Sequence, residues 1–280
     1  QEARVRPIAI EALWQLAGFQ PNDAQRAAIL HSDGPLYLPA GPGSGKTRVL
    51  LWRTVNLIVC HGVAPDRIYL STFTEKAARQ LREGLWGLLP LATNCTGRPY
   101  DTSPMYVGTV HSLCQRLILD RRFYAQRSRS RPPVLLDELG QYFYLYHPRQ
   151  WDALLASCGT EGFDSKAVNA FFGAASSSRH AAVTSAIGLF NRLSEECLRP
   201  EGLLPGAADA GFQNLLRMYA AYLGNLRSGE RAARTDFSML QQEALRVLDA
   251  FDGAGQVFQH VIVDEYQDTN TVQERLFFRL

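Results

Sequence analysis

Residues 35–47 read Pro-Leu-Tyr-Leu-Pro-Ala-Gly-Pro-Gly-Ser-Gly-Lys-Thr, and the rest of the chain is organised around this segment. The apolar run at residues 36–38 predicts a short buried strand that breaks into a glycine-rich turn. Lys46 and Thr47 then open an amphipathic helix. Strand, loop and helix in this order are the context that a phosphate-binding loop requires. The glycines let backbone N–H groups turn inward around a phosphate, and the helix N-terminus adds a positive field.

Two side chains of this loop, Lys46 and Thr47, have the groups needed to bind a nucleotide and its magnesium ion. The Lys46 ammonium can reach the β- and γ-phosphates of a nucleotide, and the Thr47 hydroxyl can hold Mg²⁺. The strict pattern has glycine where this chain has Ala40, so the alternative is a plain glycine-rich turn. That alternative does not explain a Gly-Ser-Gly-Lys-Thr run directly after a strand. The expected nucleotide-binding residues of the loop are Ala40, Gly41, Gly43, Ser44, Gly45, Lys46 and Thr47.

The composition is that of an ordinary soluble globular protein, with 46% hydrophobic and 20% charged residues. A length of 280 residues allows two compact domains or one large one. The net charge of +2 does not identify a partner, because nucleic-acid binding depends on where the charge is concentrated. No apolar run reaches the ~18 residues of a membrane span, and no signal peptide opens the chain. Since the first residue is Gln1 rather than methionine, we expect a trimmed N-terminus.

The five cysteines are scattered and include no Cys-x-x-Cys pair. This pattern argues against a zinc site or a disulfide framework. It favours a reducing, cytoplasmic setting.

Strand and helix patterns alternate over residues 35–120. Further buried strands are predicted at 67–71 and 105–107, and each leads into a helix. The helix that follows the first of these is expected to end near Pro90, before a loop over residues 92–104. Such alternation predicts a parallel sheet covered by helices, with ligands beyond the carboxyl ends of its strands.

The pattern changes after residue 120, where strand signals vanish and helical periodicity dominates. We expect an all-α domain over residues 121–235, inserted into an α/β domain made of 1–120 and 236–280. An arginine cluster at its start would follow a DNA backbone or form a solvated loop. Its members are Arg121, Arg122, Arg127, Arg129 and Arg131. Helices are predicted at 136–146, 150–157, 165–176, 180–197, 209–227 and 236–251, with loops such as 198–206 between them.

A last apolar strand, at residues 261–263, ends in the adjacent acids Asp264 and Glu265. In a chain with a phosphate loop, this pair predicts the second half of a nucleotide hydrolase site. Asp264 would bind Mg²⁺ through its water shell, and Glu265 would orient and deprotonate the attacking water. The predicted catalytic residues are therefore Glu265 and Lys46, and the predicted metal ligands are Thr47 and Asp264. Taken alone, the acids would also fit a solvated turn after a strand.

With these residues assembled, the chain resembles the N-terminal part of a UvrD/Rep-type superfamily 1 DNA helicase. The phosphate loop AGPGSGKT is the family's own form, and DEYQDTN at 264–270 is a close match to motif II. Asn22-Asp23-Ala24-Gln25 resembles the family's Q motif, which implies that Gln25 recognises adenine rather than being an ordinary exposed helix residue. Asp236-Phe237 resembles the pair that ends the family's helical insert.

Two further motifs carry the resemblance toward DNA. TFTEKAA at 72–78 resembles motif Ia, which more commonly has asparagine at the position of Glu75, and GTVHS at 108–112 resembles motif Ib, usually with phenylalanine at Val110. Both motifs contact single-stranded DNA in the family. The alternative for Phe73 is core packing, and for His111 it is a helix-start side chain bonded to backbone. The implied DNA-binding residues are Thr72, Phe73, Thr74, Thr109 and His111.

The resemblance implies a RecA-like P-loop NTPase domain, 1A, interrupted by the helical domain 1B. It also implies ATP and Mg²⁺ as cofactors, and 3′–5′ translocation on single-stranded DNA with duplex unwinding. Alternatives are a motor subunit of a RecB- or AddA-type helicase–nuclease, or a non-motor ATP-dependent DNA-binding module. The chain ends about ten residues after motif II. Motifs III to VI and a second RecA-like domain would follow, so we expect weak ATP and DNA binding, very slow hydrolysis and no unwinding.

Overall fold

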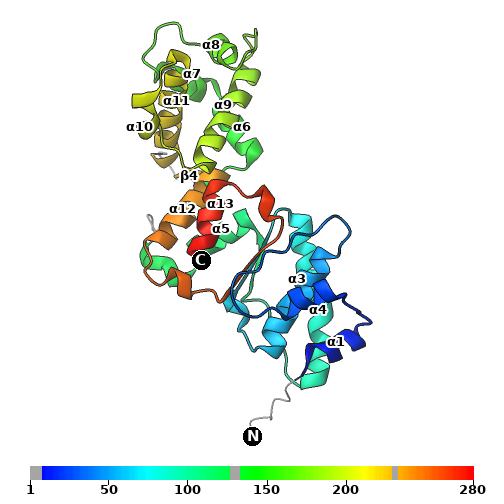
Figure 1. The fold of residues 1–280 in the computed structure, drawn as a ribbon. Helices are drawn as coiled ribbons and strands as arrows, with labels where there is room; N and C mark the ends of the chain where they lie inside the picture. Colours follow the sequence, from blue (N-terminus) through cyan, green and yellow to red (C-terminus); the bar gives the residue numbers. More distant parts are fainter. Residues whose placement is uncertain (1–7, 127–132, 229–232) are drawn as a thin grey trace. The chain divides into compact units, whose positions relative to one another are not determined.

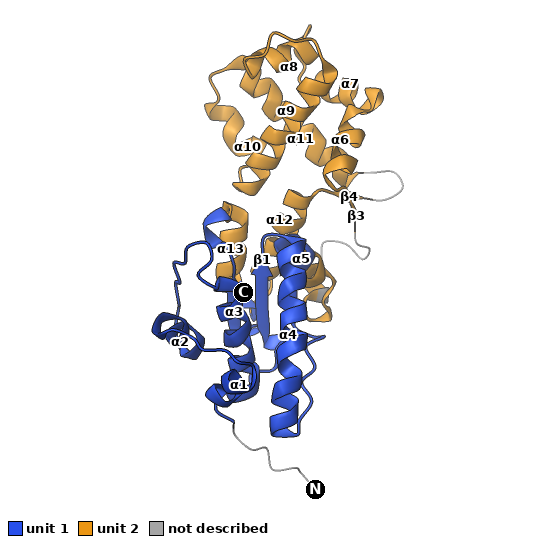
Figure 2. Ribbon diagram, turned by 90° about the vertical axis from the view of Figure 1, so that its right-hand side faces the viewer, with its two compact units in different colours: residues 1–113, 253–268, 280 blue, residues 114–252, 269–279 orange. Residues whose placement is uncertain are grey.

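The computed structural model describes residues 8–126, 133–228 and 233–280. The chain forms two compact units, coloured separately in Figure 2. The first consists of residues 1–113, 253–268 and 280, and the second of residues 114–252 and 269–279. These limits differ from the expected domain boundaries at 120 and 235, which stay a prediction.

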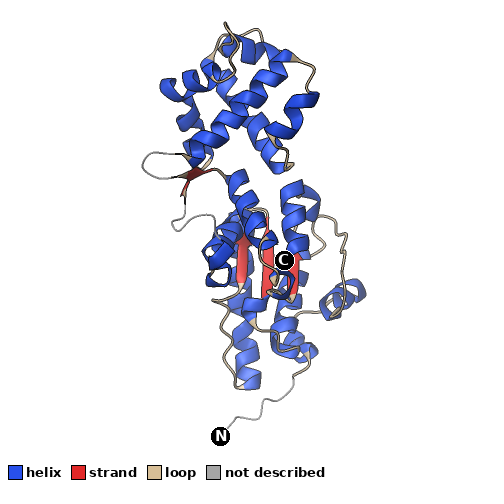
Figure 3. Cartoon of the chain, turned by 90° about the vertical axis from the view of Figure 1, so that its left-hand side faces the viewer, coloured by secondary structure: helices blue, strands red, loops and turns tan. Residues whose placement is uncertain are grey.

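A three-stranded parallel sheet lies at the centre of the first unit (Figure 3). Its order is β2–β1–β5, so the first strand in the sequence lies in the centre and pairs with two later strands. Tyr69 on β1 is in register with Tyr106 on β2 and Val261 on β5. The predicted parallel sheet is therefore confirmed, and its strands all end at the same edge. Their bounds are β1 (Ile68–Thr72), β2 (Tyr106–Thr109) and β5 (His260–Val263).

The helices of the first unit, several of which are labelled in Figure 1, complete its core with buried apolar side chains. Trp52, Leu70 and Leu81 are among its fully buried side chains. The α-helices are α1 (Ile10–Leu16), α2 (Asp23–Leu30), α3 (Lys46–Val55) and α4 (Glu75–Thr96), and α5 (Val110–Leu119) begins in this unit. Shorter turns are η1 (Asn56–Cys60), a π-helix, and η2 (Pro65–Arg67), η5 (Ala254–Gln256) and η6 (Tyr266–Asp268).

The strand predicted at residues 36–38 is wrong. This segment belongs to no strand of the described structure, and Leu36, Tyr37 and Leu38 are 42%, 79% and 38% exposed. Pro35 and Pro39 flank it, and proline has no backbone N–H to donate to a sheet. Only the three backbone N–H groups of residues 36–38 remain to pair with a neighbouring strand, and this short apolar run is not buried in the core.

The loop predicted from Pro90 onward is partly wrong, because α4 continues through this residue to Thr96. Leu85, Leu89 and Ala92 are buried along one face of the helix, and their burial holds the helical course past the missing N–H of Pro90. Gly97 ends the helix in the left-handed conformation, with φ of 70°. Residues 97–104 then form the expected irregular connection.

The second unit is built from helices packed on one apolar core. Trp151 is fully buried in this core, and Phe190 stacks on Tyr219 and Tyr222 with ring centroids 5.2 and 5.5 Å apart. All six predicted helices are present with shifted ends, whereas α10 lies where a loop was predicted. Pro200 starts α10, since proline suits the first turn of a helix.

The α-helices of this unit are α6 (Glu138–Tyr146), α7 (Pro148–Ala156), α8 (Ser165–Phe171), α9 (Arg179–Glu195), α10 (Pro200–Leu203), α11 (Ala210–Arg227), α12 (Phe237–Asp249) and α13 (Thr271–Arg279). Two 3₁₀ turns are η3 (Arg121–Gln126) and η4 (Leu204–Gly206). A two-stranded parallel pair, β3 (Val134–Leu135) and β4 (Arg234–Thr235), was not predicted. Among the described residues, no helix is long and apolar enough to cross a membrane.

Candidate functional site

The phosphate loop takes its shape from two left-handed glycines. Gly43 and Gly45 have φ of 75° and 83°, a region that costs other residues strain, and α3 begins directly after them at Lys46. A side chain at position 45 would also approach Gln25 Nε2 to 3.1 Å. The loop therefore leads directly into α3, so that the N-terminus of this helix and the Lys46 side chain lie at the same place. No strand precedes the loop within the described residues.

Gln25 is held against this loop by the start of α2. Its backbone N–H donates to Asn22 Oδ1 at 2.9 Å, and its Oε1 accepts from the Asn22 N–H at 3.1 Å, a complete capping box. The remaining amide nitrogen of Gln25 donates to the Ser44 carbonyl at 3.0 Å. The structure thus places this predicted nucleotide contact at the phosphate loop.

Lys46 and Glu265 bring the loop and the acidic segment together. The Lys46 ammonium lies 2.7 Å from Glu265 Oε1, although 219 positions separate the two residues. Glu265 has a left-handed backbone with φ of 54°, which is unusual for a residue with a side chain. Its other oxygen, Oε2, accepts a 2.6 Å hydrogen bond from Gln267 Nε2. Both oxygens of the predicted catalytic carboxylate are therefore occupied by donors.

The neighbouring carboxylate, Asp264, is positioned from β1. Its backbone N–H donates to the Ser71 carbonyl at 2.9 Å, and its Oδ2 accepts from Thr72 Oγ1 at 3.3 Å. Burial, with the charge of Glu265, raises the pKa of Asp264. The hydrogen bond from Lys46, followed by that from Gln267, lowers the pKa of Glu265, and the Glu265 hydrogen bond raises the pKa of Lys46. The two adjacent acids are thus in different electrostatic environments.

The donor set around this edge fits a magnesium ion. Asp264 contributes a carboxylate beside the lysine-bearing loop, and Thr47 contributes an exposed hydroxyl on the first turn of α3. Both are the hard oxygen ligands that Mg²⁺ prefers, and water molecules usually complete its coordination. In the part of the chain that the structure describes, this edge included, no group of three or more His, Cys, Asp or Glu side chains could hold a metal ion, so the protein would supply few of the ligands.

The predicted DNA-binding residues fall at the ends of β1 and β2, where Thr72 is in register with Thr109. Phe73 is 57% exposed, so the alternative of core packing is wrong for this side chain. Thr74 caps α4 by accepting a hydrogen bond from the Ala77 N–H at 3.1 Å. His111 is partly buried in the first turn of α5.

The hydroxyls of Thr72 and Thr109 are engaged within the protein. Thr72 donates to Asp264, and Thr109 Oγ1 donates to Glu75 Oε1 at 2.9 Å. Of the arginine cluster, Arg122 pairs with Asp120 at 2.8 Å. Arg127, Arg129 and Arg131 lie outside the described residues.

The model of the UvrD/REP helicase N-terminal domain matches residues 21–280. The chain belongs to this family. That match spans both halves of the site, from the capping box at Asn22 to the acidic pair.

Curated relatives of the UvrD/REP helicase N-terminal family agree with this assignment. The chain is 32% identical over 258 residues to the ATP-dependent DNA helicase UvrD1 of Mycobacterium tuberculosis H37Rv, covering 90% of this chain and 29% of the relative. It is 30% identical over 269 residues to the ATP-dependent DNA helicase PcrA of Bacillus subtilis 168, covering 95% and 31%. The PcrA of Leuconostoc citreum is 28% identical over 256 residues, covering 90% and 30%. The chain therefore spans less than a third of the length of these relatives.

Three residues of this UvrD/REP family site were not singled out for a role in the sequence analysis. Gln267 binds Glu265, Glu75 binds Thr109, and Arg48 lies over the Phe19 ring at 5.1 Å from its centroid. The first two lie inside the quoted motifs, so their position was a usable signal. Nothing in the sequence indicated the Arg48 contact, because it depends on how α3 packs.

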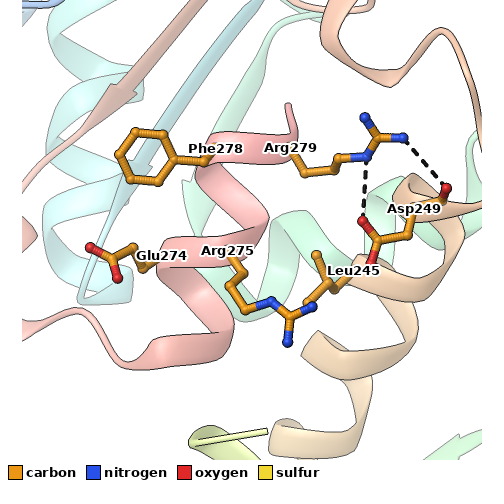
Figure 4. A pocket seen from close by; sticks show the side chains of 6 residues that line it. All are labelled: Leu245, Asp249, Glu274, Arg275, Phe278 and Arg279. Carbon is orange, nitrogen blue, oxygen red and sulfur yellow. Dashed lines mark hydrogen bonds and ion pairs between the residues drawn. The ribbon is translucent and has the colours of Figure 1, made fainter.

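The second unit also carries a groove between α12 and α13 (Figure 4). An ion pair from Arg279 Nε to Asp249 Oδ1, 3.3 Å long, closes one side of it. Phe278 is exposed on the opposite side. None of the predicted site residues lines this groove, whose lining is Leu245, Asp249, Glu274, Arg275, Phe278 and Arg279.

Proposed function

We propose that this chain is the N-terminal ATP-binding part of a cytoplasmic, ATP-dependent DNA helicase of the UvrD family. In this proposal residues 1–120 and 236–280 form the RecA-like domain, and residues 121–235 form a helical insert. The complete protein would couple ATP hydrolysis to 3′–5′ movement on single-stranded DNA and to duplex unwinding. The observation that carries the proposal is the 2.7 Å contact between Lys46 and Glu265 at the carboxyl edge of the sheet.

Nucleotide binding follows from the groups gathered at this edge. Backbone N–H groups of the loop and the Lys46 ammonium would hold the phosphates, and Gln25 would contact the base. Thr47 and Asp264 would hold Mg²⁺, which neutralises charge on the β- and γ-phosphate oxygens when bound.

Hydrolysis would begin with an exchange of partners. Lys46 binds Glu265 in the structure, whereas a bound triphosphate offers Lys46 more negative charge. Release of Lys46 would free Glu265 Oε1 to accept a proton from the attacking water. Gln267 would keep hold of Oε2 and limit the rotation of the carboxylate. A positioned general base contributes about 10² to 10⁴ in rate.

DNA would lie across the ends of β1 and β2. Exposed Phe73 offers a face on which a base can stack, a contact worth about 1–3 kcal/mol and tolerant of sequence. Thr74 and His111 would contact phosphates, and Thr72 and Thr109 would join them only after leaving their present acceptors.

Nucleotide binding by the 280-residue chain provides the test. Lys46→Ala is expected to weaken binding of a fluorescent ATP analogue with Mg²⁺ by at least about tenfold, because phosphate charge loses its main partner. Glu265→Gln is expected to retain binding. Lys166→Ala, an exposed lysine on α8, is the matched control and should bind like the parent. Equal affinities for the parent and Lys46→Ala would contradict the proposal.

Hydrolysis by the complete protein separates a motor from a non-motor binding module. There Glu265→Gln should abolish ATP hydrolysis while nucleotide binding persists. Hydrolysis at the parent rate would remove Glu265 from the role of general base.

A further inference from the structure

Glu75 joins the start of α4 to the end of β2. Strand β2 pairs with β1, and α4 lies beside β1 in Figure 2. Its Oε1 accepts the hydrogen bond from Thr109 Oγ1 at 2.9 Å. Its Oε2 lies 3.9 Å from Arg82 Nη2, and Arg82 Nη1 donates to the Val107 carbonyl at 3.0 Å. The carboxylate is thus held over the carboxyl end of β2 from two directions.

The Thr109 hydroxyl has a single hydrogen to donate. Its oxygen accepts from the Ser112 N–H at 3.3 Å, in the first turn of α5. The hydroxyl has two acceptors within reach, Glu75 Oε1 at 2.9 Å and Ser112 Oγ at 3.2 Å, and the nearer, charged carboxylate is the stronger acceptor for its single hydrogen. While Thr109 donates this hydrogen bond to Glu75, it has no hydrogen left to donate to a DNA phosphate.

The charge of Glu75 acts in the same direction. The side chain is 67% exposed, close in sequence to Phe73 and Thr74, which the proposed function places against DNA. A carboxylate there repels an approaching phosphate, most strongly at low salt. Arg82 forms only a long ion pair with it, at 3.9 Å between two exposed side chains, and such a pair offsets the charge weakly.

We infer that Glu75 is a counter-charge that weakens single-stranded DNA binding at this edge, by withholding the Thr109 proton and by repelling phosphate. The inference rests on the proposed function. A phosphate that binds here must first separate Thr109 from Glu75, and loss of the phosphate lets the pair re-form. The Glu75–Thr109 hydrogen bond can therefore break and re-form with each DNA contact, as the proposed translocation along DNA requires.

Charge-matched substitutions on α4 test this role. Glu75→Gln keeps the shape of the side chain, and the control Glu83→Gln changes the net charge equally on the same helix. Affinity for a short fluorescein-labelled oligothymidylate is measured by anisotropy at about 50 mM and about 200 mM salt. Glu75→Gln should bind about three- to tenfold more tightly at the lower salt and gain less at the higher, because salt screens the repulsion. Glu83→Gln should bind like the parent.

Thr109→Val, made in the parent and in Glu75→Gln, tests whether Glu75 acts by occupying the hydroxyl hydrogen of Thr109. Circular dichroism first establishes that the variants are folded, since Thr109 also caps α5. The gain from Glu75→Gln should shrink when the hydroxyl is absent. If Glu75→Gln raises the DNA affinity as much in the Thr109→Val background as in the parent, Glu75 does not act by occupying the Thr109 hydroxyl. If Glu75→Gln does not raise the affinity, or Glu83→Gln raises it equally, Glu75 is not a counter-charge. Absence of DNA binding by the parent and every variant instead overturns the proposed DNA contact itself, and the inference with it.

Discussion

Lys46 and Glu265 neutralise each other in the structure, with the ammonium 2.7 Å from Oε1. The pair holds the loop and the acidic segment together, and it occupies the two groups that ATP would require. Each residue therefore competes with the ligand that the other would bind. Glu265 competes with phosphate for Lys46, and Lys46 competes with water for Glu265.

Removing the negative partner should favour nucleotide. We expect Glu265→Gln to bind an ATP analogue more tightly than the parent, by up to about fivefold, the range of an exposed ion pair. Titration of the fluorescent analogue measures this. Glu161→Gln, an exposed acid in the second unit, makes the same change in net charge without touching Lys46 and should leave the affinity unaltered. Weaker binding by Glu265→Gln would show that the two residues do not compete.

Two glycines of α4 should respond to alanine with opposite signs. A Cβ at Gly87 meets nothing within 4 Å, so Gly87→Ala should raise the free energy of unfolding by about 0.5–1 kcal/mol through helix propensity. A Cβ at Gly84 would lie 2.5 Å from Leu51 Cδ1, and overpacking of this kind costs about 1–3 kcal/mol. Gly84→Ala should therefore lower stability. Urea denaturation of both variants measures the difference, and equal effects would contradict the close packing of α4 on α3.

Local patterns predicted those parts of the site that depend on neighbouring residues. The cap at Asn22, the glycine turn before Lys46 and the strand ending at Asp264 each need only a few adjacent side chains. The meeting of Lys46 with Glu265 was expected from the chemistry that both would serve. It could not be derived from periodicity, because it depends on the parallel register of the sheet.

The features that were predicted wrongly or missed depend instead on residues far apart in the sequence. Residues 36–38 have strand composition, but a strand exists only where a neighbour pairs with it. Pro90 has the chemistry of a helix end, but the burial of Leu89 and Ala92 outweighs it. The Glu75–Thr109 bond was missed because the side chains belong to different elements. Long-range packing, rather than local preference, decides all three.

Asp236 should be far more important for stability than an ordinary helix cap. It is buried, accepts from the Met239 N–H at 2.8 Å, and accepts from Tyr222 OH at 2.7 Å and Gln141 Nε2 at 3.3 Å. Asp236→Ala removes a cap and leaves the buried Tyr222 hydroxyl without the acceptor of its 2.7 Å hydrogen bond, so it should cost about 3–5 kcal/mol. Asp209 caps α11 from an exposed position, and Asp209→Ala should cost only about 1 kcal/mol. Thermal denaturation compares them, and equal losses would exclude a special role for the buried network.

His260 should make the fold sensitive to mild acid. It lies partly buried on β5, where burial, followed by the charges of Arg53 and His61, lowers the pKa of its imidazole. In the unfolded chain this imidazole takes up a proton near pH 6.5, whereas the folded chain takes it up only at lower pH. The unfolded state therefore binds more protons in this interval. The contribution of His260 to stability is complete above about pH 6.5 and is lost as the pH falls toward the folded pKa.

Replacing the imidazole should remove this dependence. We expect His260→Gln to show a shallower fall in melting temperature between about pH 7 and about pH 5 than the parent, since glutamine does not titrate. His147→Gln alters an exposed histidine at the start of α7 and serves as the control, with the parent's slope expected. The measurement is a series of thermal melts in buffers of constant ionic strength. If His260→Gln instead retains the parent's slope, the loss of stability in acid arises from other groups, and the imidazole on β5 is not excluded from protonation by its burial.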